Sequence, residues 1–374
     1  MRRLLTMTIG AASLAALAAW AAEPDAARPA KPRVEVCFVL DTTGSMSGLI
    51  EGAKEKIWAI ANELVAARPA PELKLALIGY RDRGDEYVTK VTDLTADIDE
   101  IHAQLMKFQA GGGGDGPESV NQALHEAVTK VSWTADRDVL KIVFLVGDAP
   151  PHMDYEEDVR YPEVCEVAVK RDLVINAVQC GDDDDTAAIW QEIANRAEGK
   201  YIHLVQTGGM VRIEAPQDAE IARLNREIGG TLVGYGAARA AVARKQAASE
   251  AAPAAAAADR LAFNAGTGRA VQGGGELIDA IDRGEVRLDA VKDEELPEEF
   301  RGLDAREREA RIAAKRQERQ AIQAKLEKLL AERSAFVAAE RRRRAETGTG
   351  DAFDEEVAKA VRAQAARKGI TYEK

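Results

Sequence analysis

Short, mostly apolar runs recur along the first half of the chain and are separated by longer amphipathic segments. Runs of this kind, bounded by Gly, Asp or Pro, predict buried strands. They lie at 34–40, 73–80, 91–95, 141–148, 173–179 and 201–205. The central runs are apolar throughout, which predicts strands that are covered on both faces.

Apolar positions spaced three and four apart predict helices between these strands. The predicted helices cover about 49–67, 97–109, a segment with Val120, Leu124 and Val128, 157–171, and a segment after 182–185. Strands that alternate with helices over 33–208 predict an α/β fold, a doubly wound, mostly parallel sheet with helices on both faces. Loops at the carboxyl ends of such strands form the binding crevice.

The pattern changes after about residue 208, and 209–300 is predicted to be a mixed or linker region. Residues 218–228 predict a short helix that ends at Gly229 and Gly230. The stretch 251–258 is almost pure alanine, which suits either a linker or an Ala-rich helix.

Residues 301–374 are predicted to form a charged helical region, with one long helix over 304–344. Its apolar seam also contains charged residues, so it is a weak coiled-coil signal. The seam consists of Ile312, Ile322, Leu326, Leu329 and Phe336, interrupted by Lys315, Arg319 and Arg333. The alternative is a hairpin within the chain, in which this helix pairs with 353–366.

The N-terminus has the features of a signal peptide: Arg2 and Arg3, then an apolar stretch that ends at Ala21. We expect residues 1–21 to be removed, 22–32 to be a linker, and the protein to be exported to the periplasm or the exterior. The alternative is an uncleaved membrane anchor, the only case in which we expect membrane contact.

The composition narrows the choice of function. The chain has 374 residues and a formal net charge of −12, which argues against a general nucleic-acid binder. The basic run 341–344 reads as a solvated helix face. Of the three cysteines, we expect Cys165 and Cys180 to form a disulfide and Cys37 to be a buried free thiol.

The candidate chemistry lies at two strand ends. The loop DTTGSMS follows the first strand and places Asp41, Thr43 and Ser45 two residues apart, while Asp148 ends a central strand. Oxygen ligands of this kind suit a hard cation such as Mg²⁺. Asp115 and Glu118, in the Gly-rich loop GGGGDGPE, are placed to complete the site.

Other polar groups have simpler interpretations. The run 182–185 is interpreted as the cap of the following helix, and His152, without a partner in the sequence, as a surface residue.

The motifs DTTGSMS, GGGGDGPES and FLVGDAPPH over 33–208 resemble those of von Willebrand factor A domains. The likeness is strongest to the subgroup whose second loop reads Gly-Gly-Gly-Asp-x-Pro-Glu, as in the extra domain of some alpha-type protein kinases. The resemblance implies a metal-ion-dependent adhesion site (MIDAS) for Mg²⁺, or Ca²⁺ or Mn²⁺, with Asp41, Thr43 and Ser45 on the first loop and Asp148 on the third. It does not imply a kinase, because the kinase motifs are missing.

The second loop departs from the family pattern, which has a Thr there. We assign Asp115 as the second-loop ligand, with Glu118 as the reserve; the alternative is that Asp115 only caps the next helix. Each additional protein carboxylate weakens the pull of the ion on an acidic ligand.

We therefore expect an exported, non-enzymatic protein that binds a protein partner through this metal site. One alternative is a structural, self-associating envelope protein with a structural metal. The other is a metal-assisted hydrolase, although the HExxH and GxSxG signatures are missing.

Overall fold

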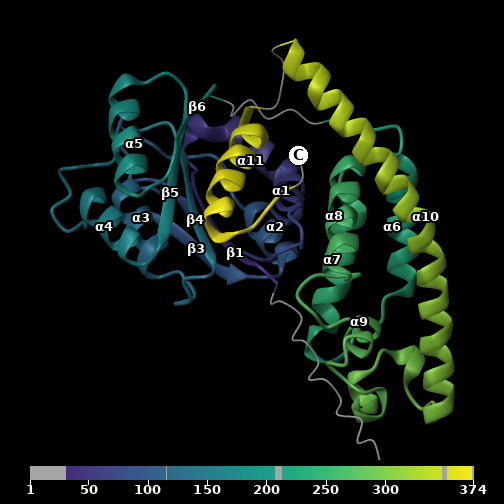
Figure 1. Cartoon of the computed structure of the whole chain (residues 1–374). Coiled ribbons are helices and arrows are strands. Elements are labelled where there is room, and N and C mark those ends of the chain that lie inside the picture. Colours follow the sequence, from purple (N-terminus) through teal and green to yellow (C-terminus); the bar gives the residue numbers. More distant parts are fainter. Residues whose placement is uncertain (1–30, 115, 207–212, 348–351, 373–374) are drawn as a thin grey trace, which may run out of the picture. The chain divides into compact units, whose positions relative to one another are not determined.

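The computed structural model describes residues 31–114, 116–206, 213–347 and 352–372 (Figure 1). Six strands form one sheet in the order β3-β2-β1-β4-β5-β6. The strands are β1 (Arg33–Asp41), β2 (Glu72–Tyr80), β3 (Thr89–Thr95), β4 (Leu140–Gly147), β5 (Leu173–Cys180) and β6 (Tyr201–Leu204). All neighbours are parallel except β3, which pairs antiparallel with β2. The predicted fold class is confirmed.

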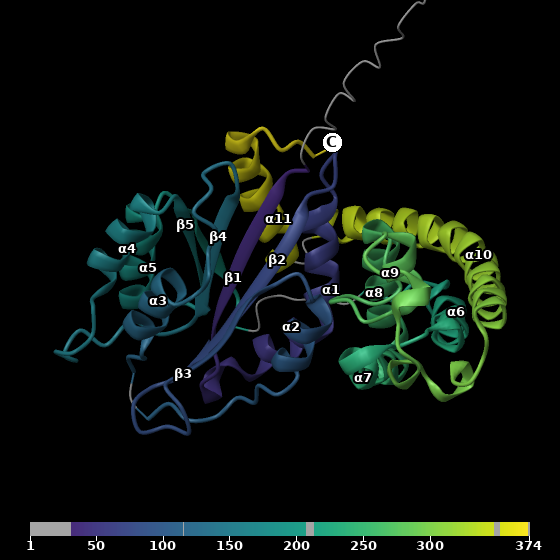
Figure 2. The ribbon, with the colours of Figure 1, turned by 90° about the horizontal axis from the view of Figure 1, so that it is seen from below.

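Helices cover both faces of this sheet (Figure 2). One layer contains α1 (Ser47–Val65), α2 (Ile98–Leu105) and α11 (Ala352–Ala365), and the other contains α3 (Val120–Thr129), α4 (Tyr161–Lys170) and α5 (Asp184–Arg196). Successive residues of β1 alternate between the two cores: Val36 and Phe38 face one, and Cys37 and Val39 face the other. Because both faces are covered, the strand is apolar at nearly every position.

The last helix of the chain, α11, packs on the sheet. Phe353, Val357 and Val361 belong to the same core as the strands. The amides of Asn176 on β5 and Gln364 on α11 donate to each other, at 3.2 and 2.7 Å. The predicted hairpin of 353–366 with the long helix is therefore wrong, because the apolar face of α11 is buried against the sheet layer.

Five further helices follow β6 in the sequence: α6 (Asp218–Thr231), α7 (Arg239–Ala251), α8 (Ala254–Thr267), α9 (Leu277–Asp282) and α10 (Ala305–Glu346). Short 3-10 turns occur at Gly44–Met46, Gly236–Ala238, Leu288–Ala290, Asp293–Glu295, Glu298–Phe300 and Ala366–Lys368. One expectation is corrected here: helix α6 continues through Gly229 and Gly230. Of the two alternatives for 251–258 the Ala-rich helix is confirmed, because Ala251 ends α7 and Ala254 begins α8, with Ala255 to Ala258 buried.

Most of the seam of α10 packs within the chain, against α6, α8 and the segment around α9, whereas Phe336 at its end is 38% exposed. Ile322 and Leu326 share a core with Ile221 and Leu261. The charged seam residues Arg319 and Arg333 are buried and bind acidic side chains, so they belong to the interface.

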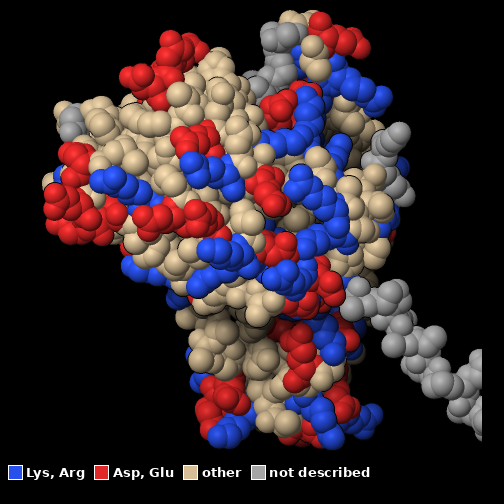
Figure 3. All heavy atoms as spheres, turned by 60° about the vertical axis from the view of Figure 1, so that its left-hand side comes forward, with Lys and Arg blue, Asp and Glu red and all other residues tan. Residues whose placement is uncertain are grey.

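The basic run at the end of α10 is surrounded by acidic partners. Arg341 pairs with Glu63, at 2.5 Å, and Arg343 and Arg344 pair with Glu340. On the face drawn in Figure 3, basic and acidic side chains are likewise interspersed. Among the described residues, no helix has the length and apolar character needed to cross a membrane.

The predicted disulfide is wrong. All three cysteines are free and buried, which confirms the expectation for Cys37. Cys180 faces the core beneath α1, whereas Cys165 on α4 faces the opposite core, so the sheet separates the two thiols. Burial raises the pKa of both thiols to about 12, which keeps them protonated and unreactive.

Candidate metal site

The candidate site lies where two neighbouring parallel strands end. Asp41 is the last residue of β1, and Asp148 follows the end of β4. A cleft of about 530 Å³ opens above them. It is lined by Thr43, Gly44, Ser45, Gly112, Gly113, Gly116, Pro117, Glu118, Asp148, Ala149, Pro150, Asp183, Asp185 and Thr186. The topology thus brings together three loops that are far apart in the sequence.

The first loop gathers three oxygen side chains. Asp41 Oδ1 accepts from the Thr43 backbone N–H at 2.8 Å and from Thr43 Oγ1 at 2.6 Å. Thr43 Oγ1 lies 3.3 Å from Ser45 Oγ. No side chain caps the turn Gly44–Met46 or helix α1, so Asp41 and Ser45 are not used as helix caps. The loop holds the hydroxyls of Thr43 and Ser45 at the mouth of the cleft, with the Asp41 carboxylate buried beneath them.

Two buried carboxylate oxygens in the site have no hydrogen-bond partner in the described part of the chain. They are Asp41 Oδ2 and Glu118 Oε2, on side chains whose residues are 0% and 4% exposed. A buried carboxylate without a partner is costly, and a cation is the kind of group that such oxygens bind. The residues present therefore fit a bound metal ion.

Glu118 is brought to the site by its backbone as well as by its side chain. Its N–H donates to Pro150 O at 2.9 Å, and its carbonyl accepts from the His152 N–H at 3.0 Å. These bonds join the second loop to the third. Asp115, the first choice for the second-loop ligand, lies outside the described residues. Helix α3 begins only at Val120, so Pro117 and Glu118 lie in the loop before it.

Burial among like charges perturbs both carboxyl groups. Burial, and then the charge of Asp148, raise the pKa of Asp41 to about 7, although bonds from Thr43 oppose the shift. Burial, with the charges of Asp41 and Asp82, raises the pKa of Glu118 to about 9. Like-charge crowding of this kind is the state that a divalent ion relieves.

The Gly-rich loop approaches the first loop closely. The Gly44 N–H donates to Gly112 O at 3.3 Å, and the Gly111 N–H donates to Thr42 O at 3.1 Å. Gly113 has φ +76°, and a Cβ at this residue would lie 3.1 Å from Glu118 Oε1. The glycines therefore allow the backbone to come close to the site and do not act as a flexible linker.

A pure carboxylate cage is absent. In residues 31–114, 116–206, 213–347 and 352–372, no group of three or more His, Cys, Asp or Glu side chains is arranged to hold a metal. Any ion at this cleft would thus need the hydroxyls of Thr43 and Ser45, with water, beside the carboxylates. That ligand set matches Mg²⁺, which keeps several waters.

Sequence reasoning missed Gln206. It follows β6, and its Nε2 donates to Asp148 Oδ2 at 2.5 Å and to Ser45 O at 3.5 Å. Its position after the last strand is the only signal in the sequence, because parallel strands end at the same edge. Gln206 links the first loop to the third and fixes the orientation of Asp148.

The interpretation of His152 as a surface residue is wrong. The side chain is 6% exposed, and its Nε2 lies 3.4 Å from Asp82 Oδ2. Its ring stacks on Tyr155, with centroids 4.1 Å apart, and the Tyr155 hydroxyl donates to Asp82 at 2.8 Å. Asp82 also accepts from Ser119 at 2.8 Å, so this cluster braces the second and third loops beside the cleft.

The interpretation of 182–185 is confirmed. Asp183 caps α5, because its side chain accepts from the Thr186 N–H at 2.6 Å. Asp184 and Asp185 lie in the first turn, where acidic side chains are favoured by the helix dipole.

Replacing Gln206 with alanine should weaken Mg²⁺ binding about tenfold, because the ligand Asp148 loses the donor that orients it. Isothermal calorimetry measures the affinity. The control is Gln191→Ala, at an exposed position of helix α5, which should leave the affinity unchanged. Equal affinities for wild type and Gln206→Ala would mean that Asp148 does not depend on Gln206.

Comparison with known proteins agrees with this fold. Residues 35–215 match the family model of the von Willebrand factor A domain. A putative ariadne-like RING finger protein of Acanthamoeba polyphaga mimivirus is 22% identical over 193 residues, 46% of this chain and 18% of that protein. Human von Willebrand factor A domain-containing protein 7 is 34% identical over 123 residues, 32% of this chain and 12% of that protein. The chain thus spans less than a fifth of the length of these relatives.

Two solved structures are similar to part of the chain. Proximal thread matrix protein 1 from the mussel byssus, in a structure with a zinc-occupied MIDAS motif, has a TM-score of 0.37 and 16% identity, covering 47% of this chain and 42% of that one. The SpRpn10 VWA domain has a TM-score of 0.36 and 13% identity, covering 47% and 89%. From the family match and the strand order, residues 35–215 form a von Willebrand factor A domain.

Proposed function

We propose that this protein is an exported, non-enzymatic binding protein that engages a protein partner through a divalent metal ion. The ion, Mg²⁺ by preference, is held in the cleft by Asp41, Thr43, Ser45, Glu118 and Asp148. The observation that carries the proposal is the pair of buried, unpartnered carboxylate oxygens on Asp41 and Glu118. Asp115 joins this set as a ligand, directly or through water.

The cleft is open to a partner. Thr43, Ser45, Glu118 and Asp148 line it, whereas Asp41 is fully buried below. A bound ion would supply a Lewis acid for an oxygen of the partner there. The residues that would hold the ion are Asp41, the hydroxyls of Thr43 and Ser45, and Asp148, which Gln206 orients.

The sequence of the second loop, GGGDGPE over 112–118, supports our proposal that this domain belongs to the subgroup with the Gly-Gly-Gly-Asp-x-Pro-Glu sequence. In that arrangement Glu118 is one of the negative groups around the ion.

Mg²⁺ should raise the melting temperature of the protein, because the ion binds the folded state only. At a concentration about 100 times Kd, the expected gain is about 2.7 kcal/mol, which corresponds to several degrees. Asp41→Asn and Asp148→Asn should each abolish the gain. Differential scanning fluorimetry measures it, and EDTA should return the wild type to its metal-free melting temperature.

The matched control is Asp172→Asn, a carboxylate at the opposite end of the sheet that pairs with Lys368. This variant should keep the full Mg²⁺ response. A response that persists in both Asp41→Asn and Asp148→Asn would place the ion elsewhere and remove the basis of the proposal.

A further inference from the structure

The cleft is lined by acidic side chains. Its charged lining residues are Glu118, Asp148, Asp183 and Asp185, and no Lys, Arg or His is among the described residues that line it. The nearest basic group is set back from the lining: the Arg81 guanidinium lies beside Gly111 and donates to Thr42 O and Gln109 O. Asp41 lies directly beneath. Asp85, which accepts from the Gly113 N–H at 3.1 Å, adds a further carboxylate beside the Gly-rich loop.

A second observation shows that one of these acidic side chains lacks a hydrogen-bond partner among the described residues. Glu118 lines the cleft, is 4% exposed, and leaves Oε2 without a hydrogen-bond partner among the described residues. The two carboxylates at the rim of the cleft, Asp183 and Asp185, differ from Glu118 because both are exposed to solvent. The Asp183 side chain also accepts from the Thr186 N–H. The buried carboxylates of Asp41 and Glu118 would be satisfied by an ion, whereas the carboxylates of Asp183 and Asp185 at the rim are exposed to solvent.

A single divalent ion does not neutralise the cleft. The ion and the nearby Arg81 together offset three charges, whereas Asp41, Glu118, Asp148, Asp183 and Asp185 supply up to five. A partner carboxylate at the open coordination position would therefore enter a region that is still negative, within a Debye length of the rim acids. Like-charge contacts of this kind disfavour a partner.

The amino end of α5 does not offset this repulsion. A free helix N-terminus attracts anions, but here the Asp183 side chain already accepts from one backbone donor, the Thr186 N–H, and the acidic residues Asp184 and Asp185 lie in the first turn. At the rim, an acidic partner would therefore meet carboxylates instead of the hydrogen-bond donors that its own carboxylates require.

We propose that the partner is a protein segment that presents lysine or arginine side chains to this cleft. Its cationic groups pair with Asp183 and Asp185 at the rim, and a neutral oxygen of the segment, a hydroxyl or a carbonyl, completes the coordination of the ion. The inference rests on the proposed function, because the cleft is taken as the binding face.

The test uses the full chain with Mg²⁺ and three fluorescent peptides of equal length, which carry lysine, glutamine or glutamate at the same positions. Fluorescence anisotropy should show the order lysine, then glutamine, with the glutamate peptide weakest. Affinity for the lysine peptide should fall as salt is raised. The double variant Asp183→Asn/Asp185→Asn should weaken the lysine peptide about fivefold, which is typical for the loss of exposed ion pairs. Asparagine keeps the cap of α5.

The matched control is Asp182→Asn/Asp184→Asn, which removes the same charge from the same segment but from side chains that do not line the cleft. It should leave the affinity within a factor of about two. Equal losses in both double variants would mean general attraction to an acidic protein and would overturn the proposal. So would tighter binding of the glutamate peptide, or no binding of any peptide.

Mg²⁺ calorimetry on the same samples separates the two ideas. If Mg²⁺ binds but the glutamate peptide is preferred, the basic-partner inference fails and the metal site stands. If Mg²⁺ does not bind but the lysine peptide binds through Asp183 and Asp185, the metal-dependent function fails and the preference for a basic segment stands.

Discussion

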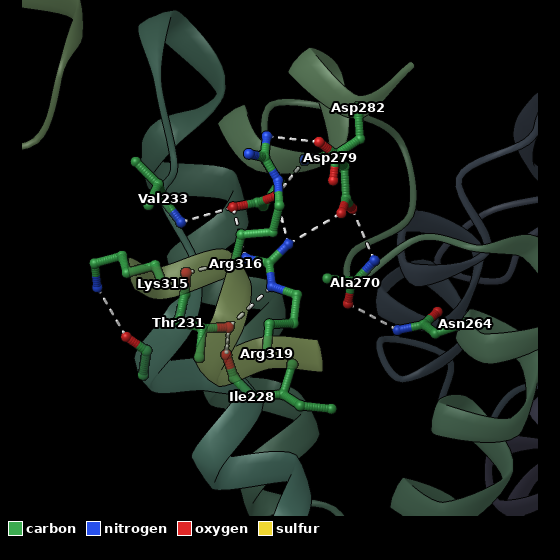
Figure 4. A network of polar contacts seen from close by, with 12 residues as sticks. Ile228, Thr231, Val233, Asn264, Ala270, Asp279, Asp282, Lys315, Arg316 and Arg319 are labelled. Carbon is green, nitrogen blue, oxygen red and sulfur yellow. Dashed lines mark hydrogen bonds and ion pairs between the residues drawn. The ribbon is translucent and has the colours of Figure 1, made fainter. Parts of the chain in front are cut away.

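Replacing Arg319 with methionine should lower the free energy of unfolding by about 3–5 kcal/mol, because it leaves buried carboxylates without their counter-ion. The Arg319 side chain is 4% exposed and lies among α6, α9 and α10 (Figure 4). It donates to both oxygens of Glu276 at 2.9 Å and to Asp279 at 3.0 Å. It also donates to Thr231 Oγ1 and Thr231 O, both at 3.0 Å. Chemical denaturation followed by circular dichroism measures the loss.

Arg316, one turn earlier on α10, provides the matched control. It pairs with Asp282 at 2.6 Å, but the two side chains are 30% and 50% exposed, so Arg316→Met should cost at most about 1 kcal/mol. Equal losses for the two variants would show that burial of the Arg319 network adds nothing to stability.

Without metal, the protein should become less stable as the pH rises from about 5 to about 9, with a fall in melting temperature of about 5 °C or more. The pKa values of Asp41 and Glu118 are raised in the folded state to about 7 and about 9, above the usual values of about 3.9 and 4.3. A raised pKa means that the folded state holds its proton more tightly than the unfolded state does. The stability from these two groups is therefore complete below about pH 4 and is lost as the pH rises through about 7 and about 9.

Mg²⁺ should reverse this trend, because the ion favours the ionised carboxylates and its binding releases protons. The gain in melting temperature should thus be larger at pH 8.5 than at pH 6, as measured by fluorimetry across the pH series. Glu118→Gln should flatten the upper part of the metal-free profile and reduce the gain from Mg²⁺.

Glu126→Gln is the control for this profile. Glu126 is also buried, but its pKa is lowered: burial raises it, and the bonds from Lys130, Thr89 and Gln122 outweigh that effect. Its contribution is lost at acidic pH, so the variant should keep the alkaline slope. An alkaline slope that is the same in wild type and Glu118→Gln would mean that Glu118 does not titrate in this range.

Wherever the signal is local, the sequence predicted the structure. Apolar runs that alternate with amphipathic segments were enough for the sheet and its two helix layers, because each strand and helix shows its buried positions in its own spacing. The loop after β1 and the Asp after β4 were found for the same reason: the end of a strand is visible in the sequence, and parallel strands end at one edge.

Long-range packing decided what the sequence left open. The cysteines were assigned by proximity along the chain, but strand alternation points Cys180 to one face, while α4 carries Cys165 on the other. His152 was expected at the surface, but folding buries its ring against Tyr155 and Asp82, and the loop that contains Asp82 is distant in the sequence. The charged residues Arg319 and Arg333 were interpreted as interruptions of the apolar seam of α10, but in the folded protein they form ion pairs with the acidic residues Glu276 and Asp218.

The sequence by itself determined the fold class of 33–208, and it pointed to the first-loop and third-loop residues that the fold brings to one cleft. Only the tertiary structure placed α11 on the sheet, brought Gln206 to Asp148 and left Asp41 and Glu118 with unpartnered oxygens. The physical reason is that secondary structure follows from the periodicity of neighbouring residues, whereas a binding site depends on side chains that only folding brings within a few ångströms of one another.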